Sequence, residues 1–248
     1  MENDFKLAVL IDGDNIPSAY VKEMMEEIAK YGNPTIKRIY GDWTKPFLSK
    51  WKNLLLENAI TPIQQYGYTT GKNATDSAMI IDAMDILHAR LVDGFCIVSS
   101  DSDYTRLATR IREDGLLVMG IGEKKTPEPF VKACEIFIYT ENLIKGAELQ
   151  GLNAKRKTKS SKTTKEKKLS SNTKLMKLLK KAYFMVILDN ETAYLGDIGQ
   201  ALRKLDSGFD PRAYGVNTLL SLFKALSDVF EIIPKDDGNS IYIKMKSK

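Results

Sequence analysis

Two short apolar runs in this chain each end in a pair of acidic residues. The first run, residues 5–11, leads into Asp12-Gly-Asp-Asn15, and the second, residues 95–98, leads into Ser99-Ser-Asp-Ser-Asp103. Apolar runs of this length that end in turn-forming residues are typical of buried strands. In open α/β sheets, the carboxyl ends of the strands form the ligand-binding edge. The sequence therefore predicts several carboxylates at one sheet edge, where a divalent cation would neutralise them.

A lysine-rich segment divides the chain of 248 residues. Residues 154–174 hold 9 Lys/Arg and a single Glu, for a net charge of +8, and their one large apolar residue is Leu169. Residues 1–153, in contrast, carry a net charge of −5. A segment of this composition buries too little apolar surface to offset the entropy lost on ordering. We therefore predict a first domain over residues 1–150, a basic flexible linker over residues 151–171 and a second domain over residues 172–248.

Residue counts exclude several kinds of site. The two cysteines, Cys96 and Cys134, are too few for a disulfide framework or a thiolate zinc site. The single histidine, His88, falls within a predicted helix, which removes histidine-rich zinc sites and a Ser-His-Asp triad. No apolar stretch approaches the roughly 18 residues that cross a bilayer. We expect a cytoplasmic protein with no membrane segment.

The first domain alternates strand and helix patterns. Strands are predicted over residues 7–11, 36–40, 61–65, 95–98, 116–121 and 136–139. Helices are predicted over residues 17–30, 46–58, 76–89, 104–114 and 130–134. Asn15 is suited to cap the first helix, and Pro17 to begin it. This alternation predicts an α/β fold with a mainly parallel sheet and helices on both faces.

The second domain has a different pattern. Helical runs are predicted over residues 175–188, 194–205 and 216–229, followed by strands over residues 230–234 and 240–245. The two strands flank Asp236-Asp-Gly-Asn239, which is a hairpin signal. Three helices followed by a hairpin predict a small winged-helix domain of α+β type.

The acidic residues after the first strand have two possible roles. Asp12, at the strand end, is the first candidate metal ligand. Asp14 and Asn15 directly precede the helix, and residues of these types are common in turns and caps. Asp14 fits a ligand and a turn residue equally well. Asn15 suits both a cap and a contact with a water or a phosphate.

The acidic residues after the fourth strand have the same two roles. A single carboxylate is enough to cap the helix predicted to begin at residue 104. Asp101, nearer the strand end, is the better ligand, and Asp103 suits both capping and metal binding. Ser100 is a candidate for hydrogen bonding to a phosphate or a metal-bound water, although serine is also an ordinary turn residue.

Helical geometry assigns a further ligand, Asp76. At ~100° per residue, Met79 and Ala83 lie within about 60° of Asp76 around the helix. Asp76 thus heads a buried stripe, where a carboxylate is costly unless it is paired, capped or bound to metal. Asp82 and Asp85 fall on other sides of the helix and are predicted to face away, solvated or paired with surface Lys or Arg.

Two cations are candidate substrate-binding residues. Lys72 lies in the loop before the helix of Asp76, within reach of a scissile phosphate or of Asp76 itself. Arg106 lies near the start of the helix that follows Asp103. Lys72 is equally compatible with simple solvent exposure, and Arg106 is the weaker candidate of the two.

Four segments of the first domain together resemble the NYN domain, which belongs to the PIN-like ribonuclease superfamily, in its bacterial LabA-like branch. They are Leu-Ile-Asp12-Gly-Asp-Asn15, Lys72-Asn-Ala-Thr-Asp76, Val-Ser-Ser-Asp101-Ser-Asp103, and Thr126-Pro-Glu-Pro-Phe130 with Ala133-Cys134 and Phe137-Ile-Tyr139. The resemblance covers about residues 4–145. It implies a Rossmann-like (PIN-like) sheet and an acidic cluster that binds Mg²⁺ or Mn²⁺ for RNA cleavage. Carried onto this chain, the cluster is Asp12, Asp76, Asp101 and Asp103, with Asn15 beside them.

The second domain resembles the LOTUS domain, also called OST-HTH, over about residues 172–246. The resemblance rests on Tyr194-Leu-Gly-Asp-Ile-Gly-Gln-Ala-Leu202 and Phe209-Asp-Pro-Arg-Ala-Tyr-Gly215, followed by Leu219 and Leu222. It implies RNA binding or contact with a protein partner.

The leading hypothesis is a Mg²⁺- or Mn²⁺-dependent endoribonuclease, with RNA affinity added by the basic linker and the second domain. The alternative is an RNA-binding regulatory adaptor without catalysis. A third hypothesis, phosphoryl transfer through an aspartyl intermediate, has Asp12 and Asp14 at the required spacing but Ile16 where a threonine is needed. The sequence leaves the oligomeric state open, and a homo-oligomer is compatible with it.

Overall fold

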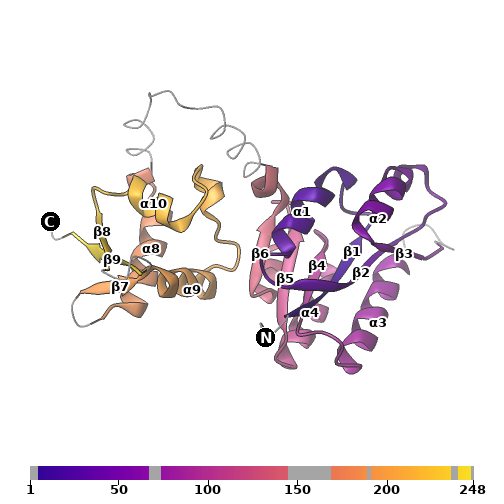
Figure 1. The fold of residues 1–248 in the computed structure, drawn as a ribbon. Coiled ribbons are helices and arrows are strands. Elements are labelled where there is room, and N and C mark those ends of the chain that lie inside the picture. Colours follow the sequence, from indigo (N-terminus) through magenta and orange to yellow (C-terminus); the bar gives the residue numbers. More distant parts are fainter. Residues whose placement is uncertain (1–4, 67–73, 145–168, 189–190, 236–239, 247–248) are drawn as a thin grey trace. The chain divides into compact units, whose positions relative to one another are not determined.

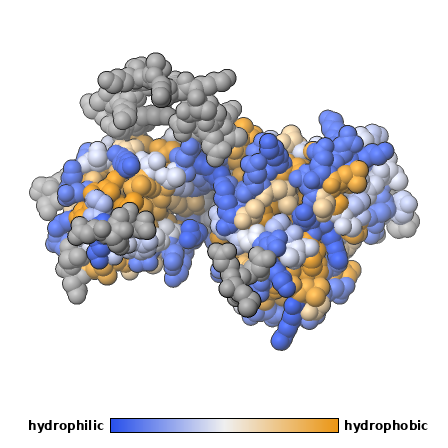
Figure 2. Space-filling model, in the orientation of Figure 1, coloured by the Kyte–Doolittle hydropathy of each residue, from blue (hydrophilic) through white to orange (hydrophobic). Residues whose placement is uncertain are grey.

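The computed structural model describes residues 5–66, 74–144, 169–188, 191–235 and 240–246. The chain forms two compact units, which divide between Ile144 and Lys145 (Figure 1). Most of the predicted linker lies outside the described residues. In the view of Figure 2, hydrophobic residues of the first unit gather in separate patches between hydrophilic ones. Among the described helices, none combines the length and the apolar character needed to cross a membrane.

A six-stranded parallel sheet forms the centre of the first unit, in the order β3-β2-β1-β4-β5-β6. The strands are β1 (Lys6–Asp12), β2 (Asn33–Gly41), β3 (Thr61–Gln64), β4 (Gly94–Val98), β5 (Leu117–Gly122) and β6 (Ile136–Tyr139). From β1 the chain builds outward to β3, then crosses back to add β4 on the other side of β1. The order therefore reverses between β1 and β4, and ligands of such sheets bind at this point, beyond the carboxyl ends of the strands.

Helices cover both faces of the sheet, which confirms the predicted α/β fold. They are α1 (Val21–Ile28), α2 (Lys52–Asn58), α3 (Ala74–His88), α4 (Thr105–Glu113) and α5 (Glu128–Ala133). Leu7, Val9 and Ile11 of β1 share a core with α1 and α2, whereas Ala8 and Leu10 share the opposite core with α3, α4 and α5. Side chains alternate between the two faces along a strand. Asp12 therefore lies on the same face as Ala8 and Leu10, towards α3 and α4.

The start of the first helical segment differs from the prediction. A 3₁₀ helix over Ser18–Tyr20 precedes α1, and the residue before it is Pro17, with no side-chain cap. Asn15 instead donates its side-chain N–H to Asp12 Oδ2. The predicted cap was wrong because the helical segment begins at Ser18, three residues after Asn15, with Pro17 at the N-cap position.

The second unit has an α+β fold, as predicted. Its helices are α8 (Thr173–Val186), α9 (Leu195–Leu205) and α10 (Leu219–Ala225), and its strands are β7 (Thr192–Tyr194), β8 (Phe230–Pro234) and β9 (Ile241–Met245). The antiparallel sheet has the order β7-β9-β8. Leu169, which lies within the range predicted as linker, is 9% exposed and belongs to the core of this unit. The predicted hairpin tip, residues 236–239, lies outside the described residues.

Candidate metal centre

Asp12 ends β1 and is fully buried. Its Oδ2 accepts hydrogen bonds from Asn15 Nδ2 (2.6 Å) and Ser99 Oγ (2.9 Å), and its Oδ1 accepts one from the backbone N–H of Asp14 (3.2 Å). Burial raises the pKa of Asp12 to about 6; the bonds from Asn15 and Ser99 oppose this rise, and the nearby charges of Asp76 and Asp14 add to it. The carboxylate is therefore held in one orientation, in a place where its negative charge is costly.

Asp76 lies in the first turn of α3 and is half-buried. Its Oδ1 accepts a hydrogen bond from Tyr104 Oη at 2.7 Å, and Tyr104 is itself fully buried. Burial raises the pKa of Asp76, and the neighbouring Asp101, Asp103 and Asp14 raise it further, against the effect of the Tyr104 bond. Several like charges thus surround Asp76, and a bound cation would relieve their repulsion.

Asp101 and Asp103 follow β4 in the turn that leads to α4. Asp101 caps the 3₁₀ helix Ser102–Tyr104, because its Oδ1 accepts the backbone N–H of Asp103 at 2.9 Å. The backbone N–H of Asp101 donates in turn to Ser99 Oγ at 3.0 Å. The capping role is thus taken by Asp101, and Asp103 is exposed. Ser99 also donates a hydrogen bond to Asp12. These hydrogen bonds connect the backbone of Asp101 and Asp103 to Asp12.

Asp76, Asp101 and Asp103 converge from two elements that are distant in sequence. One carboxylate oxygen from each lies within 4.8 Å of the other two. Two oxygens on opposite sides of a Mg²⁺ ion are about 4.2 Å apart, from a metal–oxygen distance of about 2.1 Å. The 4.8 Å limit on the separation of the three oxygens is close to that spacing. Carboxylate oxygens are also the ligands that Mg²⁺ and Mn²⁺ prefer, so these residues fit such an ion.

Asp14, which the sequence left between two roles, lies beside this group. Its Oδ2 accepts a hydrogen bond from Thr75 Oγ1 at 3.0 Å, and Thr75 directly precedes Asp76 on α3. Its Oδ1 lies 3.8 Å from Lys45 Nζ. The charge of Asp14 contributes to the raised pKa values of Asp12 and Asp76. The structure thus places a fifth carboxylate at the same sheet edge.

The candidate substrate-binding residues have different surroundings. Ser100 Oγ accepts the backbone N–H of Glu123 at 2.9 Å, which fixes the chain after β5 to this edge. Arg106 has a side chain that is 80% exposed, and its Nη1 lies 3.6 Å from Glu113 Oε1, near the far end of α4. The structure therefore directs Arg106 away from the acidic group. Lys72 lies outside the described residues.

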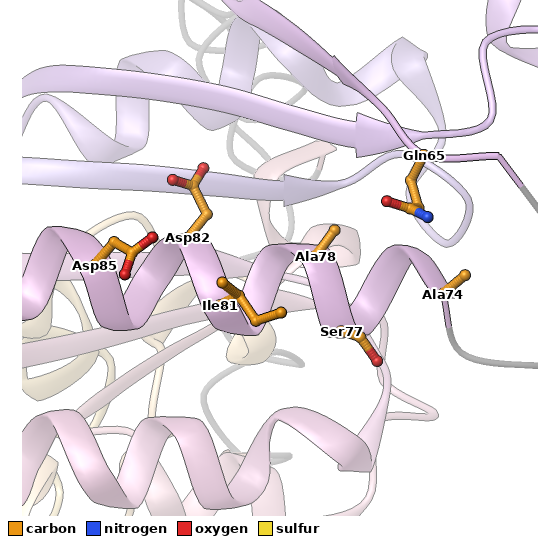
Figure 3. Close-up of a pocket in the computed structure, with 7 residues that line it drawn as sticks. All are labelled: Gln65, Ala74, Ser77, Ala78, Ile81, Asp82 and Asp85. Carbon is orange, nitrogen blue, oxygen red and sulfur yellow. The ribbon is translucent and has the colours of Figure 1, made fainter.

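Asp82, predicted to face away from the sheet, contacts it. Its carboxylate accepts hydrogen bonds from Arg38 and from the hydroxyl of Tyr40, both on β2. In Figure 3, Asp82 points from α3 towards the strands. Asp82 and Asp85 both line an open depression of about 470 Å³. The prediction of an Arg or Lys partner was right, but the orientation was wrong because β2 lies against this side of α3.

Two residues near the acidic group were missed from the sequence. Tyr104 had a usable signal: with Leu107, Ala108 and Ile111 it forms the i, i+3, i+4, i+7 stripe of a buried helix face. That signal predicts a buried side chain at Tyr104, and its contact with Asp76 depends on how α3 and α4 pack on the sheet. Lys45 had no such signal, because its partner Asp14 lies 31 positions earlier, on another strand-to-helix turn.

Two family models match this chain, one in each unit. The family model of the NYN domain matches residues 6–143, and that of the OST-HTH/LOTUS domain matches residues 168–242. Among curated proteins, none matches this sequence. The crystal structure of a protein of unknown function from Vibrio parahaemolyticus is similar at a TM-score of 0.47 and 18% identity, over 55% of this chain and 93% of that one. The first unit is a PIN-like α/β fold, and the chain belongs to the NYN family, with an OST-HTH/LOTUS domain after its NYN domain.

Proposed function

We propose that this protein is a metal-dependent endoribonuclease, with Asp76, Asp101 and Asp103 as ligands of the ion. The observation that carries the proposal is the convergence of their oxygens within 4.8 Å, beside the buried carboxylate of Asp12 and at the ligand-binding edge of the sheet. A Mg²⁺ or Mn²⁺ ion supplies an activated water and neutralises charge on the phosphate when bound. The NYN domain belongs to a nuclease superfamily, which supports this reaction class.

The residues around the ligands have positioning roles in this proposal. Asn15 and Ser99 hold Asp12 in one orientation, and Ser99 also fixes the backbone of Asp101. Tyr104 occupies one oxygen of Asp76, so that the other is left for the ion. The OST-HTH/LOTUS domain and the basic linker, most of which lies outside the described residues, are proposed to bind the RNA strand or a protein partner. Electrostatic binding of this kind weakens with rising salt.

A second candidate, an RNA-binding adaptor without catalysis, is favoured by one observation. Several of the carboxylates have protein partners: Asp101 caps a helix, Asp14 faces Lys45, and Asp12 accepts three hydrogen bonds. An acidic edge stabilised in this way needs no ion to fold. Firm RNA binding with no cleavage in Mn²⁺ or Mg²⁺ would support this candidate.

The direct test is metal removal from the full chain. We expect single-stranded RNA to be cut at internal positions in Mn²⁺, and EDTA to reduce the rate at least about 100-fold, since a bound ion contributes several kcal/mol to the transition state. Added Mn²⁺ should restore the rate. Calorimetric titration of the metal-free protein with Mn²⁺ gives an independent readout. Absence of binding at millimolar Mn²⁺ would contradict the assigned ligands.

Replacing Tyr104 with phenylalanine is expected to weaken Mn²⁺ binding about 10-fold, the lower end of the effect seen for groups that orient metal ligands. Burial raises the pKa of Tyr104 well above its usual value, so the hydroxyl remains a donor to Asp76 at neutral pH. Its loss frees Asp76 to rotate and raises the pKa of that carboxyl. Mn²⁺ titrations at several pH values measure the change. If the variant binds Mn²⁺ as tightly as wild type at every pH, Tyr104 does not help to position the metal ligands.

A further inference from the structure

The loop after β2 lies at the same sheet edge as the acidic group. Tyr40 of β2 pairs with Asp12 of β1, so residues 42–47 leave the sheet beside the turn that holds Asp14. Lys45 Nζ lies 3.8 Å from Asp14 Oδ1, a buried oxygen that accepts no hydrogen bond from the described residues. Through Asp14 and Thr75, Lys45 is connected to the turn that carries Asp76.

Hydrogen bonds to Asp42 hold this loop, and two of its side chains are exposed. The buried Asp42 accepts hydrogen bonds from the backbone and hydroxyl of Thr44 (3.2 and 2.6 Å) and from Gln64 Nε2 (3.1 Å). The 3₁₀ helix Pro46–Trp51 that follows packs Leu48 and Trp51 into the core. Phe47 lies on its other side and is 49% exposed. Core packing therefore does not account for an aromatic residue at position 47.

Lys45 and Phe47 together offer a positive charge and an aromatic ring. Lys45 Nζ lies 5.8 Å from the centroid of the Phe47 ring, and its side chain is 47% exposed. The Lys45 ammonium is on the exposed side of this ion pair and 3.8 Å from the carboxylate oxygen, too far for a hydrogen bond, so it remains available to an external anion. Proteins bind single-stranded nucleic acid with this combination, lysine on the phosphate and an aromatic ring on the base.

A cation on the β2 side of the acidic cluster also reduces the repulsion between the carboxylates and the phosphates of RNA. Five carboxylates repel the phosphate groups of a strand that approaches them, and an ion at the ligands neutralises only the phosphate next to it. Arg106 was predicted to bind the substrate, but its side chain extends along α4 towards Glu113. Lys45 supplies a positive charge on the β2 side instead.

We propose that Lys45 and Phe47 form a subsite for one nucleotide of single-stranded RNA, in which Lys45 pairs with the phosphate and Phe47 stacks on the base. The subsite rests on the proposed function, because the bound strand is the one that the acidic cluster would cut. It adds a binding position on the β2 side of the cluster, one or more nucleotides from the scissile bond.

The test measures RNA affinity by fluorescence anisotropy, in full-length protein that carries Asp101→Asn to prevent cleavage. Lys45→Ala should raise the Kd for a short single-stranded RNA about 5-fold and reduce the slope of log affinity against log salt by about 0.7, the value for one phosphate contact. Phe47→Ala should raise the Kd roughly 5- to 100-fold, the usual contribution of one stacked base, and leave the salt slope unchanged. With blunt duplex RNA, Phe47→Ala should have no effect, because paired bases are already stacked.

Two matched controls lie at the opposite edge of the sheet. Lys30 is an exposed lysine paired with Glu27 at 2.8 Å, and Leu91 is an exposed apolar residue before β4. Lys30→Ala and Leu91→Ala should bind RNA as the parent does. The conservative changes Lys45→Arg and Phe47→Tyr should retain most of the affinity, which separates loss of contact from misfolding.

The outcomes separate this inference from the proposed function. Unchanged affinity in both Lys45→Ala and Phe47→Ala overturns the subsite, whereas cleavage by the wild-type protein in Mn²⁺ still supports the nuclease. If the wild-type protein does not cut RNA but both variants lose affinity, the subsite stands as part of a binding protein. An equal loss in the control variants would also overturn the inference, because the effect would then be one of general charge or surface.

Discussion

Asp101→Asn is expected to reduce Mn²⁺-dependent RNA cleavage at least about 100-fold, or about 3 kcal/mol of transition-state free energy. Asparagine has nearly the same shape as aspartate and retains an oxygen for the backbone N–H of Asp103, so the cap of the 3₁₀ helix survives. What is lost is one of three negative charges within 4.8 Å of one another. Initial rates on labelled single-stranded RNA measure the effect, and calorimetry should show weaker Mn²⁺ binding.

Asp85→Asn is the matched control, because it makes the same chemical change as Asp101→Asn at a different place on the protein. Asp85 lies on α3, lining the depression of Figure 3 rather than the acidic group, so its replacement should leave the cleavage rate within about 2-fold of wild type. If Asp101→Asn and wild type cut RNA at equal rates, the proposed ligand set is wrong. If both variants lose activity equally, the loss reflects overall charge and not metal binding.

The fold was predictable where burial alone determines the pattern. Every residue of Gly94–Val98 is buried because helices cover both faces of β4, so an uninterrupted apolar run marks the strand. Thr192–Tyr194 was missed because three residues carry no period, and this strand exists through its pairing with β9. The third helix of the second unit was predicted over residues 216–229 but runs only over Leu219–Ala225. It starts later than predicted because Thr218 caps it by accepting the backbone N–H of Ser221.

The site was predictable to the extent that it depends on local rules. Asp12 and Asp101 were predicted at this edge because they lie at or just after strand ends, and Asp76 because helical geometry places it at the head of a buried stripe. The bonds that organise these carboxylates join residues far apart in sequence, as Tyr104 joins Asp76 and Ser99 joins Asp12. Such pairs depend on the order of the strands in the sheet. The sequence predicted a mainly parallel sheet but not the order of its strands.

Asp12→Asn is expected to change how stability depends on pH. In the metal-free protein, burial raises the pKa of Asp12 from 3.8 to about 6. Below pH 4, Asp12 is protonated in the folded and unfolded states and has no pH-dependent effect. Between pH 4 and 6 the unfolded chain releases this proton while the folded chain keeps it, so the free energy of unfolding falls as pH rises. Above pH 6 the penalty is complete, at about 3 kcal/mol for a shift of about two pKa units.

Asparagine does not titrate, so the stability of Asp12→Asn relative to wild type should rise by about 3 kcal/mol between pH 4 and pH 7. Both tryptophans, Trp43 and Trp51, lie in the first unit, and their fluorescence during urea unfolding follows that unit within the full chain. Mn²⁺ should stabilise wild type at pH 7 more than the variant, because cation binding offsets the charge of Asp12. A stability difference that is constant with pH would mean that Asp12 ionises without penalty, and that its burial does not prepare the site for a cation.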